Sequence, residues 1–200
     1  MARFNRRISP KVIAGAVQER NRTVPTPTYW NTDQKVPVID KERPGRGYRH
    51  LLRKKDIFDF IELLPHWDDL AVGLNAVLLA AGEEGLYGWY DTGVVGVCAW
   101  PRDLWTKESR DYYDMHKGLY ARLGVPSEPR GELILWKHTE ATARAFQLLR
   151  VFLHELGHHH DRMTTKSKIA STRGEDYAEN YAIRYEDMIW DRYIAKFGLY

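Results

Sequence analysis

The sequence predicts an α+β fold in one main domain, preceded by a basic, proline-rich arm. Apolar runs that fit strands gather in the middle of the chain, and two long amphipathic helices follow them. The chain has 200 residues, 44% of them hydrophobic, which suffices for one domain with a sizeable core and a tail. We therefore expect a short, mostly antiparallel sheet packed on two consecutive helices.

The arm is expected over residues 1–47, which hold five of the nine prolines and show no sustained helical or strand period. Residues 1–55 carry 14 Lys or Arg and 4 Asp or Glu, whereas residues 56–200 carry 16 and 23, so the net charge of +3 conceals a strong asymmetry. The arm is expected to be partly disordered or to wrap the domain as a strap, with Tyr29 and Trp30 docking. It could contact nucleic acid through phosphates, or the acidic face of its own domain.

The main domain is expected over residues 48–200, and its early elements follow from apolar spacing and turn residues. Pro65 ends the first helix, glycines punctuate the hairpin GLYGWYDTGVVGVCAW, and PSEPRG precedes the strand GELILW. In chain order we expect a helix over 54–64, a buried strand over 76–80, two strands within 85–100, a helix over 103–123 and a strand over 131–136.

Two helices complete the domain. Thr139 can cap the first, which carries apolar residues at helical spacing from about residue 140 to about residue 160. A polar connection separates it from the second helix, which is expected from about 175 to 196 and ends at Gly198.

The first of these two helices contains the stretch VFLHELGHHHD. His154 and His158 are four residues apart, so they lie on one helix face, where two imidazoles can bind one zinc ion. Glu155 lies about 100° around the helix, too far for a third ligand but within reach of a water on the metal. Gly157 lets another segment pass close to the metal side. This is the HExxH pattern of zinc peptidases, with Glu155 as the general base.

Catalytic zinc needs three protein ligands and one open position, and the second helix supplies acidic candidates. Its start, EDYAE over 175–179, resembles the second motif of gluzincin metallopeptidases. The resemblance implies that Glu175 is the third zinc ligand and that Glu179 braces a ligating histidine. Glu179 stands where that family has Asp or Asn, so the two assignments could also be reversed. The longer HExxHxxGxxH pattern fails, because Thr164 occupies its third histidine position.

The resemblance covers residues 76–195, in which hairpin, strand, HExxH helix and glutamate helix follow in the order of a minimal gluzincin domain. It implies a small zincin-like domain, similar to that of regulatory repressor-cleaving peptidases, that uses Zn²⁺ to hydrolyse a polypeptide substrate. An endopeptidase is expected, since no extra domain would bind a free terminus. An edge strand near 94–100 would pair with an extended peptide, and its backbone or a tyrosine of the last helix would stabilise the oxyanion.

Other readings stay open. One is a catalytically inactive zinc-binding module, or a nucleic-acid-binding module that uses the basic arm; another is a zinc hydrolase acting on a non-peptide bond. His159 and His160 are expected away from the ligand face, exposed or supporting a ligand. Asp161 either orients an imidazole or ends the helix.

Composition suggests a compartment. Cys98 is the sole cysteine, which excludes an intrachain disulfide and a cysteine-ligated zinc cluster, and it reads as a buried, inert thiol. No apolar run approaches the ~20 residues that span a bilayer, and the N-terminal apolar run is short for a signal peptide. We expect a cytoplasmic protein without a membrane partner; the oligomeric state and the cleavage specificity do not follow from the sequence.

Overall fold

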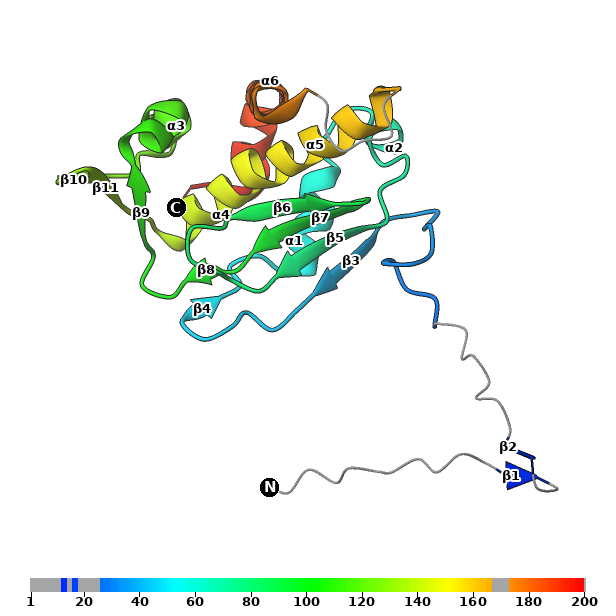
Figure 1. Ribbon diagram of the computed structural model, residues 1–200. Helices are drawn as coiled ribbons and strands as arrows, with labels where there is room; N and C mark the ends of the chain where they lie inside the picture. Colours follow the sequence, from blue (N-terminus) through cyan, green and yellow to red (C-terminus); the bar gives the residue numbers. More distant parts are fainter. Residues whose placement is uncertain (1–11, 14–15, 18–25, 167–172, 200) are drawn as a thin grey trace.

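A computed structural model describes residues 12–13, 16–17, 26–166 and 173–199 (Figure 1). The elements, in chain order, are β1 (Val12–Ile13), β2 (Ala16–Val17), β3 (Val38–Lys41), β4 (Tyr48–Arg49), α1 (Lys54–Ile61), α2 (Trp67–Leu70), β5 (Ala76–Ala80), β6 (Gly88–Asp91), β7 (Val94–Cys98), β8 (Trp100–Pro101), β9 (Trp105–Ser109), α3 (Arg110–Leu123), β10 (Ser127–Arg130), β11 (Leu133–Lys137), α4 (Glu140–Phe146), the π-helix η1 (Gln147–Phe152), α5 (Leu153–Thr164) and α6 (Gly174–Phe197). No helix among these residues is both long and apolar enough to cross a bilayer.

The α+β fold is confirmed, and most strand pairings are antiparallel. The largest sheet has the strand order β3-β5-β7-β6, in which β6 pairs antiparallel with β7. Its other two pairings, β3 with β5 and β5 with β7, are parallel. The helices α1 and α2 lie between β3 and β5 in the chain and supply the crossover that a parallel pair needs.

The main hydrophobic core lies between one face of this sheet and the helices. Leu79 and Val97 point into it from β5 and β7, and Phe60 of α1 meets Phe152 of η1 edge-on, with ring centroids 5.6 Å apart. In Figure 1 the sheet faces the viewer, α1 lies behind it, and the helical rod from α4 to α5 runs alongside β6. The sheet and the rod together support the residues around the HExxH stretch.

Part of the predicted arm packs on the main domain. β3 hydrogen-bonds along β5 as the edge strand of the sheet. Tyr29 packs on the outer sheet face and donates a hydrogen bond to Asp40 Oδ2 at 3.1 Å, while the Trp30 ring stacks on Trp89 at 6.0 Å. Tyr29 and Trp30 therefore dock on the outer face of the sheet, beside Asp40. Most of the remaining arm lies outside the described residues.

The predicted helices and strands are confirmed where the segment is strongly buried, and one predicted helix begins too early, at a boundary between strand and helix. The buried strand over 76–80 and the last helix ending at Gly198 are confirmed. The helix expected over 103–123 begins only at Arg110, because the preceding residues form β9 and pair with β11. Ser109 marks the change, since its side chain accepts the hydrogen bond of Tyr112 N at 3.2 Å.

Candidate metal centre

The HExxH stretch lies in α5, which continues the rod of α4 and η1 without a break. It packs against α6 at Gly157, where an added Cβ would lie 2.8 Å from Ala178 Cα and 3.1 Å from Tyr181 Cβ. Such distances are too short for a real side chain, so the glycine allows the two helices to approach closely. The close approach brings the first turn of α6 beside the histidines of α5.

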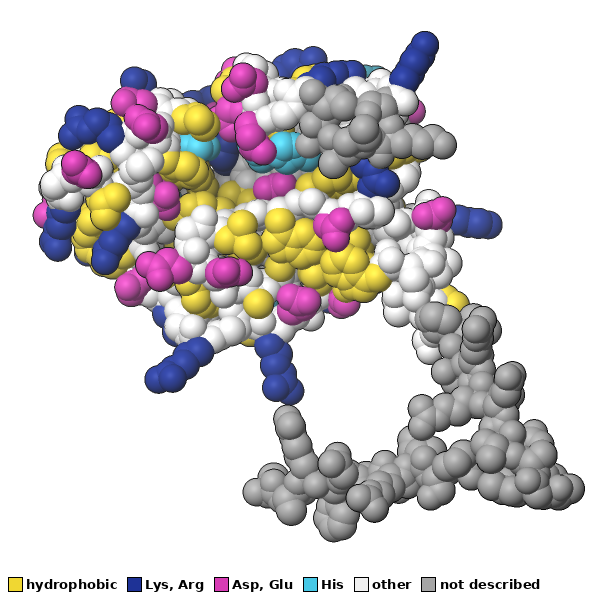
Figure 2. Space-filling model, viewed as in Figure 1, with side chains coloured by type: hydrophobic (Ala, Val, Ile, Leu, Met, Phe, Trp, Pro, Cys, Tyr) yellow, Lys and Arg dark blue, Asp and Glu magenta, His cyan; other side chains and the backbone are white. Residues whose placement is uncertain are grey.

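Three predicted ligands meet at this point. His154 Nε2 lies 3.1 Å from Glu175 Oε2 and 3.1 Å from His158 Nε2, and His158 Nε2 lies 3.5 Å from the same Glu175 oxygen. These three residues form a group whose ligand atoms could share one metal ion. Figure 2 shows histidine and acidic side chains side by side in a hollow of the surface between α6 and the sheet.

Glu179 occupies the position of a brace rather than of a ligand. Its Oε2 lies 3.2 Å from His154 Nδ1, on the side of the ring opposite Glu175. A carboxylate only accepts, so Nδ1 donates to Glu179, and Nε2 is the nitrogen that faces His158 and Glu175. Such a carboxylate partner is the usual support of a metal-binding histidine.

Arg150 holds the Glu179 carboxylate in place, and the sequence analysis did not identify this arginine as a site residue. Its Nη1 donates to Glu179 Oε1 at 2.5 Å and its Nη2 donates to Glu186 Oε2 at 2.7 Å, with the arginine side chain only 5% exposed. Arg122 adds a further pair to Glu186 at 2.8 Å. Arg150 lies in the π-helix η1, whose wider turn changes the direction of side chains relative to the α-helix that the sequence predicts. The short run QLLRVF contains no signal for this change.

The two histidines experience opposite electrostatic environments. Burial alone would lower the pKa of His154, but the hydrogen bond to Glu179 and the charges of Glu155 and Glu179 raise it above its ordinary value. Burial and the neighbouring His154 lower the pKa of His158. The cluster therefore concentrates carboxylates around His154 and favours a positive charge there.

Glu155 lies beside the cluster and faces β6. Burial raises the pKa of its carboxyl group to about 7, and the charge of Glu175 acts in the same direction. A Cβ on Gly88 would lie 2.9 Å from Glu155 Oε1 and 2.4 Å from Val151 Cγ1, so only a glycine in β6 lets the strand approach the carboxylate this closely. Gly88 is a second site residue that sequence reasoning missed.

Two cavities open on either side of this point along β6. One, of about 340 Å³, has Leu86, Tyr112 and Met115 in its wall; the other, of about 360 Å³, has Trp89 and Tyr90. Both are also lined by Gly88, His154, Glu155 and Glu175. The candidate centre thus lies in the middle of a longer depression.

Two expectations about the substrate-binding strand and the oxyanion donors need correction. The segment 94–98 is β7, an inner strand between β5 and β6, so its backbone is already paired on both sides. The edge strand beside the cluster is β6. The tyrosines of α6 turn elsewhere: Tyr177 OH bonds His160 Nδ1 at 2.7 Å, and Tyr181 is buried.

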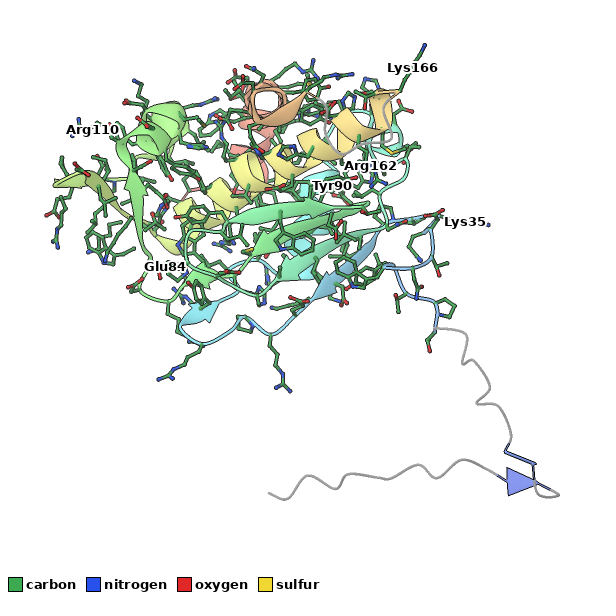
Figure 3. All side chains as sticks on the ribbon, viewed as in Figure 1. Lys35, Glu84, Tyr90, Arg110, Arg162 and Lys166 are labelled. Carbon is green, nitrogen blue, oxygen red and sulfur yellow. The ribbon has the colours of Figure 1, made fainter. Side chains whose placement is uncertain are left out.

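The residues after His158 hold the fold together. His159, expected to be exposed or to support a ligand, is 1% exposed, and its Nδ1 lies 3.2 Å from Tyr90 OH. Arg162 donates to the same hydroxyl, which ties α5 to β6 (Figure 3). Asp161 neither ends α5 nor has a hydrogen bond to an imidazole among the described residues; it accepts from Arg173 N at 2.9 Å and fixes the start of α6.

Cys98 is buried, as expected, and burial raises the pKa of its thiol to about 12.

Comparison of the chain with protein-family models, curated proteins and solved structures finds no match. The assignment of a function therefore depends on the geometry of the cluster itself.

Proposed function

We propose that the protein is a zinc-dependent peptide hydrolase. The observation that carries this proposal is the convergence of His154 Nε2, His158 Nε2 and Glu175 Oε2 at separations of 3.1 to 3.5 Å. Two ligands on a tetrahedral zinc ion, each ~2.0–2.1 Å from the metal, are about 3.3 Å apart. Two imidazoles and one carboxylate with an open side are also the donor set of hydrolytic zinc sites.

These residues fit zinc, which would be held by His154, His158 and Glu175. Zinc bound there would polarise the carbonyl group of the substrate and lower the pKa of water. Glu179 keeps His154 in the tautomer that offers Nε2, and Arg150 keeps the Glu179 carboxylate in place.

Glu155 is the general base in this proposal. Its carboxylate lies in the depression, beside the ligands but not among them, and its pKa of about 7 suits proton transfer near neutral pH. It takes a proton from the attacking water and delivers it to the leaving amine.

The proposed substrate is an extended polypeptide that pairs with the free edge of β6. Cavities on both sides of the cluster allow the chain to continue in both directions, which favours internal cleavage over removal of a terminal residue. A cytoplasmic location is part of the proposal and rests on the single, buried cysteine.

The test compares the unmodified chain with Glu155→Gln, using zinc content and the cleavage of unfolded casein as readouts. We expect about one zinc per chain in both proteins and a loss of ~10²–10⁴-fold in hydrolysis for the variant, because an amide cannot accept the proton. Zinc binding without hydrolysis by the unmodified chain would instead support the inactive zinc-binding module. Lack of zinc binding would overturn the proposal.

A further inference from the structure

The cavity of about 340 Å³ beside the candidate metal centre has an apolar mouth and a polar group at its buried end. Leu86 and Met115, which are 37% and 59% exposed, lie at the mouth, whereas Val151 and His116, each 5% exposed, lie deep in the wall. Met115 and His116 belong to α3, which Figure 1 shows on the side of the molecule where β6 begins. We call this space, which these two residues of α3 line, the α3 cavity.

One ring nitrogen of His116 is left without a hydrogen-bond partner. Its Nδ1 lies 2.9 Å from Tyr112 O, and because a carbonyl oxygen only accepts, Nδ1 is the donor. Burial lowers the pKa of His116, so the ring is neutral at neutral pH and Nε2 carries a lone pair. This Nε2 has no hydrogen-bond partner among the residues that the structure describes.

The atom that His116 Nε2 faces cannot satisfy it. Glu179 Oε2, from a residue that lines the same cavity, lies 3.9 Å from Nε2, and a carboxylate oxygen also only accepts. That oxygen already accepts the hydrogen bond of His154 Nδ1. Buried polar atoms in native proteins are nearly always paired, so the unpaired Nε2 indicates a donor that enters the α3 cavity.

The walls of the α3 cavity suit an aromatic ring with a neutral tip. Tyr87 and Tyr112 lie in the wall with their ring centroids 6.1 Å apart, and aromatic rings pack well on one another. Glu179 at the buried end is already paired with Arg150, so a charged tip would lose its water without gaining a free counter-ion. Tyrosine combines an apolar ring with a neutral donor at its far end.

We propose that the α3 cavity selects a tyrosine side chain of the polypeptide substrate, with His116 Nε2 accepting the hydrogen bond of the tyrosine hydroxyl group. The cavity is also lined by His154, Glu155 and Glu175, so a residue that occupies it lies next to the bond that is cleaved. The inference rests on the proposed peptidase function only in calling the peptide a substrate, since the binding of a tyrosine peptide can be measured without cleavage.

The experiment uses the full chain with Glu155→Gln, incubated with zinc, and fluorescein-labelled ten-residue peptides of alanine and serine in which one central residue is varied. Tyrosine is compared with phenylalanine, which lacks the hydroxyl group, with 4-methoxyphenylalanine, which keeps the oxygen but cannot donate, and with lysine. Fluorescence anisotropy should show about tenfold tighter binding of the tyrosine peptide than of the other three, as expected when a buried acceptor gains its donor.

Substitutions of His116 in the same protein assign the preference to this residue. His116→Leu should bind the tyrosine and phenylalanine peptides equally, whereas His116→Gln, which retains an acceptor, should keep part of the preference. Lys117→Leu is the matched control, because Lys117 is an exposed neighbour on α3 outside the cavity, and it should keep the whole preference. The comparison of peptides on the parent protein decides the inference even if a variant fails to fold.

Three results would overturn the inference. The first is equal affinity for the tyrosine and phenylalanine peptides, or binding of neither, which would mean that a water molecule satisfies Nε2. The second is tighter binding of the lysine peptide than of the tyrosine peptide. The third is a tyrosine preference that survives His116→Leu.

The same measurements separate this inference from the proposed function. If the unmodified protein cleaves casein but binds and cuts the tyrosine and phenylalanine peptides equally, the peptidase proposal stands and the assignment of the α3 cavity is wrong. If the tyrosine peptide binds preferentially but neither it nor casein is cut, the assignment of the α3 cavity stands and the peptidase proposal is wrong.

Discussion

Arg150 and Glu179 form a buried ion pair, with Arg150 Nη1 2.5 Å from Glu179 Oε1, directly behind the candidate metal centre. The second oxygen of Glu179 lies 3.2 Å from His154 Nδ1, so the arginine acts on the histidine through the carboxylate. The other terminal nitrogen of Arg150, Nη2, binds Glu186 of α6. The orientation of the His154 ring therefore depends on buried ion pairs between η1 and α6.

Removing this arginine should destabilise the protein strongly. Arg150→Met removes the guanidinium group that Glu179 and Glu186 share and leaves Glu186 only its pair with Arg122, which costs ~3–5 kcal/mol. Urea unfolding in the presence of a chelator measures the free energy of unfolding independently of metal. Arg130→Met is the matched control, since Arg130 is exposed and its pair with Glu128 contributes at most ~1 kcal/mol. Equal stability of the two variants would contradict the buried network.

The two glutamates of α6 should differ in their effect on zinc. Glu175→Gln removes a ligand, whereas Glu179→Gln retains an acceptor for His154 and weakens only its support, a loss of ~10–100-fold in affinity. We expect the larger loss for Glu175→Gln, measured by competition with a chromophoric chelator. The opposite ranking would make Glu179 the ligand, the alternative that the sequence leaves open.

The contact at Gly157 should be sensitive to a single methyl group. Gly157→Ala places a carbon 2.8 Å from the Ala178 backbone, so α5 and α6 must separate, at a cost of ~1–3 kcal/mol. Zinc affinity should fall as well, because Glu175 moves with α6. Gly118→Ala is the control: nothing lies within 4 Å of its added carbon, and it should be neutral or stabilising by up to ~1 kcal/mol. A tolerated Gly157→Ala would mean that the helices pack less closely.

Acid should destabilise the protein partly through His138. Burial lowers the pKa of His138 to about 4, and neither ring nitrogen has a hydrogen-bond partner among the described residues. A depressed folded-state pKa means that the histidine favours folding above its unfolded pKa of ~6.5 and loses this contribution as the pH falls towards 4, a loss of ~2–3 kcal/mol.

The measurement is the pH dependence of the free energy of unfolding, from urea titrations between pH 7 and pH 4 in a chelator. His138→Leu should flatten this dependence and stabilise the protein at the acid end, since the surroundings are the rings of Trp100, Tyr120 and Phe146. An unchanged slope in the variant would show that His138 is not buried as a neutral group.

The sequence by itself determined the features that depend on local spacing. His154 and His158 share a helix face because an α-helix repeats every ~3.6 residues, and this holds wherever the helix packs. The buried strand over 76–80 and the last helix likewise follow from continuous or periodic burial. The small residue at 157 also indicated a close neighbour, although not its identity.

Only the tertiary structure decided which distant residues meet. Glu175 is 21 positions from His154, and its oxygen reaches 3.1 Å only because α6 crosses α5 at Gly157. The same crossing turns Glu179 towards Nδ1, and the π-helix turns Arg150 towards Glu179. Strand order decided that β6, and not β7, is the edge beside the cluster. Local periodicity fixes which residues share a face, but the separation of two faces depends on how closely whole elements pack, and that is a property of the complete fold.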